Sequence, residues 1–240
     1  MLESEAPKTV AVLLSTMRSG STLLKALLAT APDVSDLPET DFQRFTGERA
    51  SSRLHALSPE PILVLKRPAW FNEIGRYPRL PEVPRLKRIV LVRDAYPNVL
   101  SIRRMLFRHV PFLLRTNVGN RFLVERYWFP ITERLAGLAA VDPIDTRLVR
   151  YEDLLEDPEG ATARLFEFLG SARTEGTADY GAPADYEWKW GSDDGGERIR
   201  TLSVGRPREE SSVDARLAET ISRSASVSAL RRRLGYSAPP

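Results

Sequence analysis

The sequence predicts an α/β fold, a doubly wound parallel sheet flanked by helices in a single domain. Two observations indicate this fold. Short apolar runs suited to buried parallel strands occur at residues 9–14, 61–66, 88–93 and 145–155. Segments with helical spacing lie between them, so strand and helix alternate along the chain. In a sheet of this kind, ligands bind at the carboxyl ends of the strands.

The first half of the chain supplies three of these strands. The run TVAVLL is continuously apolar and β-branched, which is typical of a central strand covered on both faces. STLLKALLAT follows it with leucines three and four residues apart, which predicts a helix. PILVLK forms the second run. RIVLVR leads into DAYPNVLSIRRML, where Asp94 and Pro97 suit the start of a helix.

The second half continues the alternation. Residues 120–140 predict a helix interrupted near Pro130. The fourth strand run is followed by DPEGATARLFEFLG, another predicted helix. Residues 173–197 are rich in Gly, Asp, Ser and aromatic side chains and predict a loop or lid near the acceptor. Residues 211–234 return to helical spacing and complete one domain over residues 1–240.

The composition limits the class of protein. A chain of 240 residues with 42% hydrophobic residues is long enough for one substantial core. The chain has no cysteine, and its two histidines, His55 and His109, match no motif, so we expect no protein-bound metal. No run reaches the roughly 18 apolar residues of a membrane helix, and the first residues do not resemble a signal peptide. We expect a cytoplasmic protein without a membrane partner.

The basic residues are unusual in kind. Arginine accounts for thirty of the 35, while the net charge is only +3. Arginine suits bidentate contacts with phosphate or sulfate. The base composition of a genome produces the same excess, so only arginines at strand ends or turns carry weight. The small net charge argues against nucleic acid as a partner, although the arginine content leaves that alternative open.

The segment STMRSGSTLL, residues 15–24, joins the first strand to the first helix. Unpaired N–H groups converge at a helix start, and the helix dipole favours negative charge, so this segment predicts an anion site. Gly20 permits close backbone approach, Ser21 and Thr22 supply hydroxyls, and Arg18 supplies a positive charge. The Walker pattern is absent, because its first glycine and its lysine are missing. A Mg²⁺-dependent triphosphate site is therefore disfavoured.

Three segments carry a resemblance to a known family. MRSGSTLL resembles the phosphosulfate loop of sulfotransferases that use 3′-phosphoadenosine-5′-phosphosulfate (PAPS), with Met17 in place of the usual proline. Bacterial and tyrosylprotein branches carry Pro-Arg-Ser-Gly-Thr-Thr there. IVLVRDAYPNVLSIRR is similar to the 3′-phosphate signature, in which an arginine precedes a helical serine by eight residues, as Arg93 precedes Ser101. RTLSVGRPRE resembles the C-terminal cofactor loop, with Arg200 and Gly205 at matching positions.

The resemblance covers about residues 10–208 and implies a P-loop-like fold with its cofactor core at 9–208. It implies PAPS as cofactor, 3′-phosphoadenosine-5′-phosphate (PAP) as product, and no metal. The implied cofactor ligands are Arg18, Ser19, Gly20, Ser21, Thr22, Arg93, Ser101, Arg200, Gly205 and Arg206. The last loop lacks the family's Lys-Gly and tryptophan, so Arg206 and Arg208 remain alternatives to Arg200 for the 3′-phosphate.

The catalytic residues follow from the same resemblance. Sulfuryl transfer is an in-line displacement that needs a base for the acceptor and a cation on the leaving oxygen. The histidine base of cytosolic members is absent, because Pro68 stands two residues after Lys66. Tyrosylprotein sulfotransferases use a glutamate in a Glu-Glu-Thr segment after His-Pro-Asp-Val. APDVSDLPET matches that segment and places Glu39 in this role.

The motifs are closest to the tyrosylprotein branch, since Lys66 also fits its Asn-Lys-Asp-Pro segment. The arginine after its threonine is Asp41 here, which argues against a peptide substrate. The resemblance implies Glu39 as base, Lys66 as the cation on the leaving oxygen, and Arg18 on the phosphosulfate. Each has a structural alternative: Glu39 also suits a helix cap, Lys66 a solvated strand end, and Arg18 and Arg93 surface charges.

The acceptor is less well defined. RFLVERYWF and DYEWKW contain aromatic residues that suit a flat phenolic or glycosylated acceptor. Core packing explains Phe122, Tyr127 and Trp128 equally well, and Trp188 and Trp190 lie in the predicted lid. We expect a small hydroxylated metabolite, as in bacterial secondary metabolism. A small-molecule kinase and a non-catalytic module that binds nucleotides or nucleic acid remain the alternatives. The sequence indicates neither the oligomeric state nor the order of binding.

Overall fold

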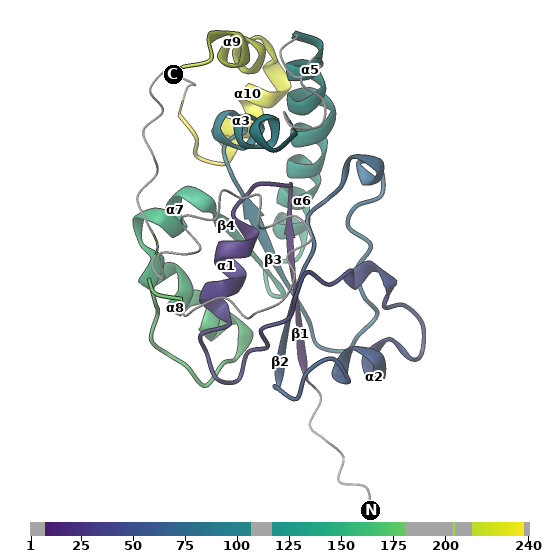
Figure 1. The fold of residues 1–240 in the computed structure, drawn as a ribbon. Coiled ribbons are helices and arrows are strands. Elements are labelled where there is room, and N and C mark those ends of the chain that lie inside the picture. The colour runs from purple at the N-terminus through teal and green to yellow at the C-terminus, as the bar shows by residue number, and fades with distance from the viewer. Residues whose placement is uncertain (1–7, 107–116, 181–203, 205–212, 238–240) are drawn as a thin grey trace, which may run out of the picture.

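The computed structural model of the protein describes residues 8–106, 117–180, 204 and 213–237. Four parallel strands in these residues form one sheet, in the order β2-β1-β3-β4 (Figure 1). The strands are β1 (Thr9–Ser15), β2 (Ile62–Lys66), β3 (Leu86–Val92) and β4 (Thr146–Arg150). Because β2 and β3 pair on opposite sides of β1, the connection from β1 leads to one side of it and the connection from β2 crosses back to the other. The topological switch point therefore lies at the carboxyl end of β1, where such sheets bind ligands.

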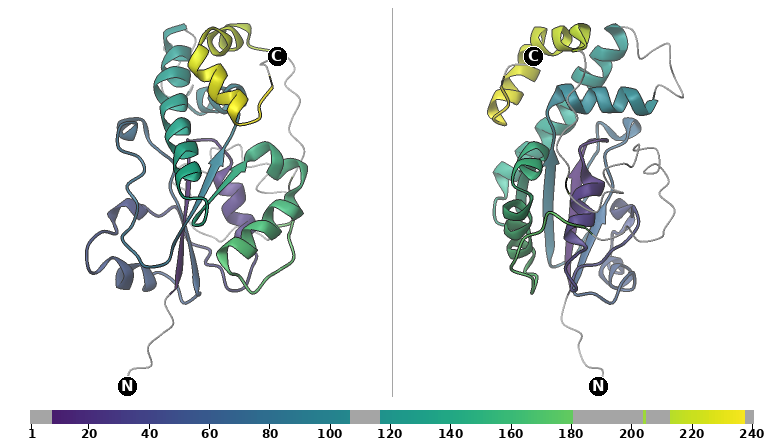
Figure 2. Two further views of the ribbon diagram at one scale, coloured as in Figure 1. Left: turned by 180° about the vertical axis from the view of Figure 1, so that it is seen from behind. Right: turned by 60° about the vertical axis from the view of Figure 1, so that its left-hand side comes forward.

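Alternate side chains of β1 enter two different apolar cores. Ala11 and Leu13 pack in the core that contains residues of α1 (Ser21–Leu28), α7 (Tyr151–Glu156) and α8 (Pro158–Leu169). Val10, Val12 and Leu14 pack in the core that contains residues of α6 (Phe129–Val141) and α2 (Ala50–His55). Helices thus cover both faces of the sheet, as Figure 2 also shows. The predicted doubly wound parallel α/β fold is confirmed.

Several helices gather beyond the carboxyl ends of the strands (Figures 1 and 2). They are α3 (Ala95–Leu106), α5 (Asn117–Arg121), α9 (Ala215–Arg223) and α10 (Ala225–Arg233). Leu217 and Ile221 of α9 and Leu230 of α10 are buried in the same core as α6. The described part of the predicted C-terminal helical region is thus two helices that meet at Ser224.

The structure differs from the sequence-based prediction at two elements. The fourth strand ends at Arg150 and not near residue 155, because Tyr151 begins α7. Glu152 and Asp153 lie in the first turn of this helix, where the helix dipole favours acidic side chains.

The predicted interruption near Pro130 is the second difference. The chain stays helical there: the π-helical segment η3 (Phe122–Trp128) connects α5 to α6. The Phe129 N–H donates to the Val124 carbonyl, five residues back, which widens the helix just before Pro130. Proline has no N–H to donate, and its ring would clash with a carbonyl in a regular α-helix. The helix therefore widens just before Pro130 and continues without a break.

The connections on the α6 side of the sheet contain short helical turns. These are η1 (Phe42–Arg44) and η2 (Phe71–Glu73), together with α2. Phe42 and Leu54 are fully buried, which fixes these turns to the core beside β2. The segments that leave the carboxyl ends of β1 and β2 thus have a defined course.

Candidate active site

The loop between β1 and α1, residues 16–22, is called the anion loop below. Its backbone is in the left-handed region at Arg18 (φ 64°) and at Gly20 (φ 92°), which is the N-cap of α1. Ser21 and Thr22 begin the helix and are buried. The first N–H groups of a helix have no acceptor within it, so they converge on this loop. A Cβ at Gly20 would lie 2.3 Å from ring carbons of Tyr151, so the position also requires glycine for packing.

Neutral hydrogen bonds fix the anion loop from behind. Ser19 Oγ lies 2.6 Å from Thr16 Oγ1. Asn98 Nδ2 of α3 donates to Ser19 Oγ (3.2 Å) and to the Met17 carbonyl (3.0 Å). The Tyr127 hydroxyl accepts from the Met17 N–H at 2.7 Å, and burial raises the pKa of this tyrosine. Because the Ser19 side chain faces this buried network, its backbone N–H is the group that remains for a ligand.

Arg93 and Ser101, the predicted 3′-phosphate ligands, both contact Arg18. Arg93 Nη1 donates to the Arg18 carbonyl (2.9 Å), and its guanidinium carbon lies 4.5 Å from the centre of the Tyr151 ring. Arg18 Nε donates to Ser101 Oγ at 3.1 Å. The Trp128 indole N–H donates to the Arg93 carbonyl (3.0 Å). The structure therefore brings the loop arginine and the 3′-phosphate signature together at one place.

Lys66 and Glu39, the predicted catalytic pair, are in direct contact. Lys66 Nζ lies 3.0 Å from Glu39 Oε2 and donates to Thr22 Oγ1 at 2.9 Å. The Lys66 side chain is 7% exposed and that of Glu39 is 29% exposed. The ammonium group thus links the start of α1 to a carboxylate that solvent reaches. A cation and a carboxylate at this spacing suit a reaction in which negative charge develops on one oxygen and a proton leaves another.

Residues 36–41, called the base segment below, are attached to the sheet and to α1. Lys25 Nζ of α1 is bonded to Asp36 Oδ1 and to the Leu37 carbonyl, both at 2.5 Å. Burial lowers the pKa of Lys25, although the bond to Asp36 acts in the opposite direction. The Thr40 N–H donates to the Lys66 carbonyl at 3.2 Å. Glu39 is therefore held from both sides and does not cap a helix at Thr40, where none begins.

Sequence reasoning missed several residues of this site. Lys25 lies among the leucines of a core-facing helix, and a lysine in such a place is a signal of a buried partner. Asn98 and Tyr127 gave no signal, because their partners are far away in sequence. Of the other predicted ligands, Arg200, Gly205 and Arg206 lie outside the described residues, as do Trp188 and Trp190. Most of the predicted lid lies outside them too; its residues 173–180 are described and contain no helix.

Among the residues that the structure describes, no group of three or more His, Cys, Asp or Glu side chains could hold a metal ion. His55 Nε2 lies 3.4 Å from Ser51 Oγ within α2, and His109 is outside the described residues. No described helix is long and apolar enough to cross a membrane.

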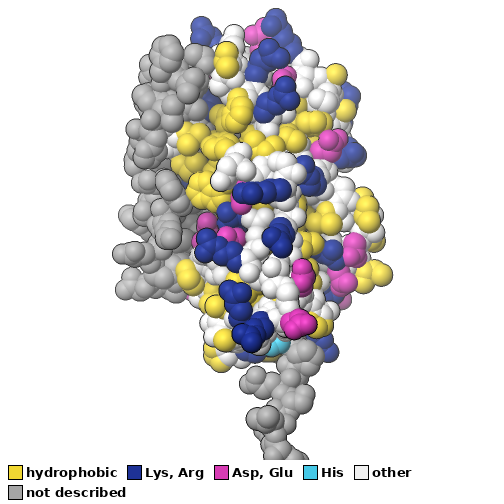
Figure 3. Space-filling model, turned by 90° about the vertical axis from the view of Figure 1, so that its right-hand side faces the viewer, with side chains coloured by type: hydrophobic (Ala, Val, Ile, Leu, Met, Phe, Trp, Pro, Cys, Tyr) yellow, Lys and Arg dark blue, Asp and Glu magenta, His cyan; other side chains and the backbone are white. Residues whose placement is uncertain are grey.

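An open hollow lies beyond the end of β2. It has a volume of about 460 Å³ and is lined by Arg67, Trp70, Phe71 and Asn72. Phe122 is 43% exposed and lies 5.9 Å from Phe71, measured between ring centres. Figure 3 shows that apolar side chains gather on the face at the right-hand side of Figure 1, with basic side chains around them.

The aromatic run from residue 122 to residue 128 divides between surface and core. Tyr127 and Trp128 are fully buried, whereas Phe122 reaches the surface. Of the two explanations that the sequence left open, core packing therefore holds for Tyr127 and Trp128. Phe122 alone of these three can face a ligand beside the hollow.

The chain is similar to a known family over more than half of its length. A profile described as the sulfotransferase family matches residues 43–175. This range is more than half of the chain and contains Lys66, Arg93 and Ser101, but it begins after the anion loop and Glu39. The curated relatives include the omega-hydroxy-beta-dihydromenaquinone-9 sulfotransferase Stf3 of Mycobacterium tuberculosis, 34% identical over 91 residues. The match covers 36% of this chain and spans only about a quarter (24%) of that relative's length.

Solved structures with a similar fold cover nearly the whole chain. The sulfotransferase domain from the curacin biosynthetic pathway has a TM-score of 0.58 and 20% identity, and the match covers 97% of this chain and 99% of that one. A sulfotransferase from Alicyclobacillus acidocaldarius has a TM-score of 0.54 and 14% identity, with 97% and 98% covered. Mouse sulfotransferase SULT7A1 complexed with PAP has a TM-score of 0.54 and 14% identity, with 96% and 90% covered. At these identities the likeness shows the fold.

Proposed function

Because the chain belongs to the sulfotransferase family, we propose that it transfers a sulfuryl group from PAPS to a hydroxyl of a small acceptor. The observation that carries this proposal is the contact of Lys66 Nζ with both Thr22 Oγ1 and Glu39 Oε2. This contact joins the start of the anion-binding helix to a carboxylate at the carboxyl end of β2. An anion site, a cation and a base are thus adjacent, as an in-line displacement requires.

We assign the roles as follows. Glu39 accepts the proton of the acceptor hydroxyl while that oxygen forms its bond to sulfur. Lys66 neutralises the charge that develops on the oxygen between sulfur and phosphorus as that bond breaks and PAP leaves. Arg18 and the N–H groups of the anion loop hold the phosphosulfate. PAPS supplies the activated sulfuryl group, and no metal is needed in this scheme.

PAP and PAPS are the proposed ligands because of the cluster formed by Arg18, Arg93 and Ser101. Two guanidinium groups and a hydroxyl at the end of β3 suit a phosphate, which accepts bidentate hydrogen bonds from arginine. The similarity in fold to mouse SULT7A1 complexed with PAP supports the same assignment. Arg200, Gly205 and Arg206 remain proposed ligands of the same nucleotide.

The acceptor is proposed to be a small molecule with an apolar body. The hollow lined by Trp70 and Phe71 also includes Arg67, the residue after Lys66, and offers apolar contact area there. The relative Stf3 is named for a hydroxylated menaquinone derivative, which has such a body. An aromatic or glycosylated metabolite fits this side of the site.

Calorimetric titration of the purified protein with PAP, without metal, tests the proposal. AMP and ATP with Mg²⁺ are the controls. We expect PAP to bind, and AMP to bind far more weakly because it lacks the 3′-phosphate. Transfer from radiolabelled PAPS is then measured to 2-naphthol, 1-decanol and a phenyl glucoside. A preference for ATP with Mg²⁺ would favour a kinase, and binding of nucleic acid without turnover would favour a non-catalytic module.

A further inference from the structure

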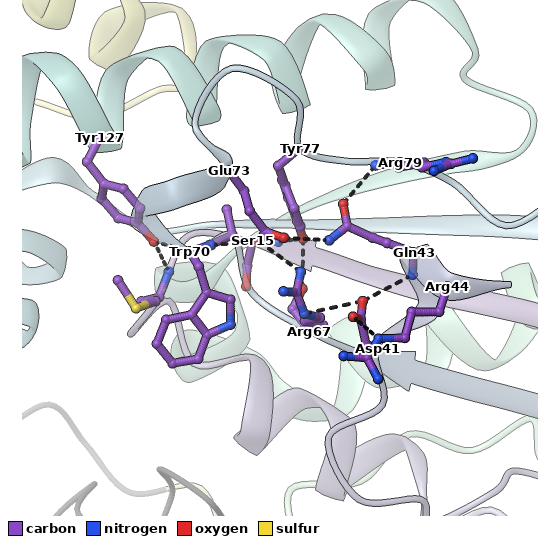
Figure 4. A network of polar contacts seen from close by, with 12 residues as sticks. Ser15, Asp41, Gln43, Arg44, Arg67, Trp70, Glu73, Tyr77, Arg79 and Tyr127 are labelled. Carbon is purple, nitrogen blue, oxygen red and sulfur yellow. Dashed lines mark hydrogen bonds and ion pairs between the residues drawn. The ribbon is translucent and has the colours of Figure 1, made fainter.

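Directly after Lys66, the Arg67 side chain lies between two carboxylates (Figure 4). Its Nε is 3.3 Å from Asp41 Oδ1, and its Nη1 is 2.8 Å from Glu73 Oε2. The Arg67 side chain is only 16% exposed. The Tyr77 hydroxyl donates to the Arg67 carbonyl at 2.8 Å, which fixes the backbone as well. Arg67 is therefore held at both its main chain and its side chain.

The Glu73 carboxylate is buried and fully bonded. It is 7% exposed and accepts from Arg67 Nη1, from the Trp70 N–H (3.2 Å) and from Gln43 Nε2 (3.1 Å). Buried ion pairs contribute little net stability, because desolvation offsets the attraction, but they define one geometry. A charge-assisted network with this many bonds specifies where Arg67 points.

Asp41 connects this network to the base segment. It stands two residues after Glu39, and the Thr40 N–H between them is bonded to the Lys66 carbonyl. Glu39 of the first segment thus pairs with Lys66, and Asp41 pairs with the next residue, Arg67. Two residues span at most about 7 Å of extended chain, so a displacement of Asp41 moves Glu39.

We propose that Arg67 is a positioning residue: by holding Asp41 beside Glu73, it fixes the Glu39 carboxylate next to Lys66. This inference rests on the proposed function, in which Glu39 is the base. A misplacement of about 1 Å can lower turnover by roughly 10²-fold. Arg67 also lines the hollow, so direct contact with the acceptor is the rival role that the experiment must separate.

Asp41 and Arg67 both differ from the residues at the matching places of the tyrosylprotein motifs. Those motifs have arginine after the Glu-Thr pair and aspartate after the lysine. This chain has Asp41 and Arg67 at the corresponding places, so both charges are exchanged. Since the side chains are within 3.3 Å of each other, the exchange leaves an attractive pair.

The test compares three variants in transfer from PAPS to 2-naphthol. Arg67→Met removes the cation, and Arg67→Met/Glu73→Gln also removes the carboxylate that would be left buried and unpaired. Arg44→Ala is the matched control, because Arg44 contacts the same Asp41 carboxylate (2.9 Å) but is 78% exposed. We expect the kcat of the double variant to fall about tenfold or more, with PAP affinity and KM for 2-naphthol within about twofold. Arg44→Ala should match the wild type.

Repeating the double variant in a Glu39→Gln background identifies the route of the effect. A residue that acts through Glu39 loses its effect on kcat once Glu39 is gone. An equal loss in both backgrounds, a rise in KM with unchanged kcat, or no loss at all would each overturn the inference. An unchanged kcat for Glu39→Gln alone would instead refute the proposed base, and with it this inference.

Hydrogen exchange gives a readout that does not need turnover. The Thr40 amide should exchange faster in the double variant and at the wild-type rate in Glu39→Gln, because only the former loosens the base segment. Unchanged exchange in the double variant would overturn the positioning role even if no acceptor is turned over. If the Thr40 amide exchanges faster in the double variant but the wild type turns over no acceptor, Arg67 still anchors the base segment. Only the proposed transfer activity is then refuted.

Discussion

Two regions meet at the carboxyl end of β1, and opposite kinds of contact hold them. The anion loop is fixed by backbone geometry and by the neutral groups of Thr16, Ser19, Asn98 and Tyr127. The charged groups that contact it are cations, Arg93 at the Arg18 carbonyl and Lys66 at Thr22 Oγ1. The base segment is fixed by ion pairs of Lys25, Lys66 and Arg67 with acidic partners.

The difference fits the role that we propose for each region. A loop that binds an anion is weakened by any carboxylate beside it, so neutral bonds are the suitable support. A base segment must contain a carboxylate in a partly buried place, and cations must balance it. The same edge of the sheet therefore combines a rigid neutral loop with a charged segment.

The largest effect is expected from Gly20→Ala, which breaks the neutral region. The new Cβ would meet the Tyr151 ring at 2.3 Å with the backbone at φ 92°. Overpacking and the left-handed backbone together should cost roughly 2–4 kcal/mol of unfolding free energy, and PAP binding should be lost with the loop geometry. Gly47→Ala is the control, because Gly47 also has positive φ (79°) but nothing lies within 4 Å of its Cβ position. If denaturant melts give the same loss of unfolding free energy for Gly20→Ala and Gly47→Ala, the packing argument is refuted.

Glu39→Gln breaks the charged region without changing its shape. Turnover should fall by about 10²-fold or more, the usual effect of removing a general base. PAP affinity should stay nearly unchanged, because the loop and the Arg93 cluster do not depend on Glu39. The two quantities are measured by transfer of label from PAPS and by calorimetry. Full turnover by the variant would remove Glu39 as the base.

Arg93→Ala tests the cation that the neutral region presents to the ligand. PAP affinity should weaken by about 1.5–3 kcal/mol, the contribution of a hydrogen bond to a charged group. The affinity for AMP, which has no 3′-phosphate, should fall much less. Arg164→Ala, with a side chain 67% exposed on α8, controls for the loss of one positive charge. If calorimetry gives the same PAP affinity for Arg93→Ala and the wild type, the 3′-phosphate site lies elsewhere.

Tyr127→Phe removes a neutral support of the anion loop. Its hydroxyl accepts from the Met17 N–H and donates to the Ala69 carbonyl (2.6 Å), so the variant leaves two buried polar groups unpaired. Unfolding free energy should fall by about 1–3 kcal/mol. Tyr77→Phe is the matched variant, because the Tyr77 hydroxyl makes the same pair of bonds at greater length: it accepts from the Ser15 N–H at 3.2 Å and donates to the Arg67 carbonyl at 2.8 Å (Figure 4). Thermal melts should show the larger loss of stability, and PAP titrations the larger loss of affinity, for Tyr127→Phe. The reverse order would contradict this prediction.

The smallest effect concerns an ion pair outside both regions, between Arg103 of α3 and Asp214 at the start of α9. Burial acts to raise the pKa of Asp214, but the Leu217 N–H and Arg103 outweigh it, so this pKa lies below its ordinary 3.8. A lowered pKa in the folded state stabilises the protein above pH 3.8, and the gain is lost as the pH falls through the lowered value. Asp214→Asn should cost less than about 1 kcal/mol at pH 7, because solvent screens the pair.

The pH dependence provides the check on this pair. The difference in unfolding free energy between wild type and Asp214→Asn should shrink as the pH falls below 3.8. Tyr127→Phe should show no such trend over the same range, because it removes only neutral bonds. Denaturant melts at pH 7 and in the acid range measure both differences.

The sequence by itself determined the fold class and the local motifs. β-branched runs and leucine spacing predict the sheet and α1, because these patterns depend on neighbours in the chain. Gly20 with Ser21 and Thr22 predicts an anion loop for the same reason, and Arg93 and Ser101 are linked by one helix. The strand end at Arg150 and the π-helical turn before Pro130 were not predicted, because their geometry depends on hydrogen bonds that periodicity does not report.

The tertiary structure decided which distant residues meet. Lys66 contacts Glu39 across 27 positions of chain, and the Asn98 amide contacts the Met17 carbonyl across 81. No local pattern reports such pairs, since they arise from the order of strands in the sheet and from the packing between layers. Arg67 follows the strand run 61–66 and gave no signal in the sequence, and only its place between Asp41 and Glu73 supports the proposed positioning role. Side-chain partners over long separations are set by packing, which a single sequence does not display.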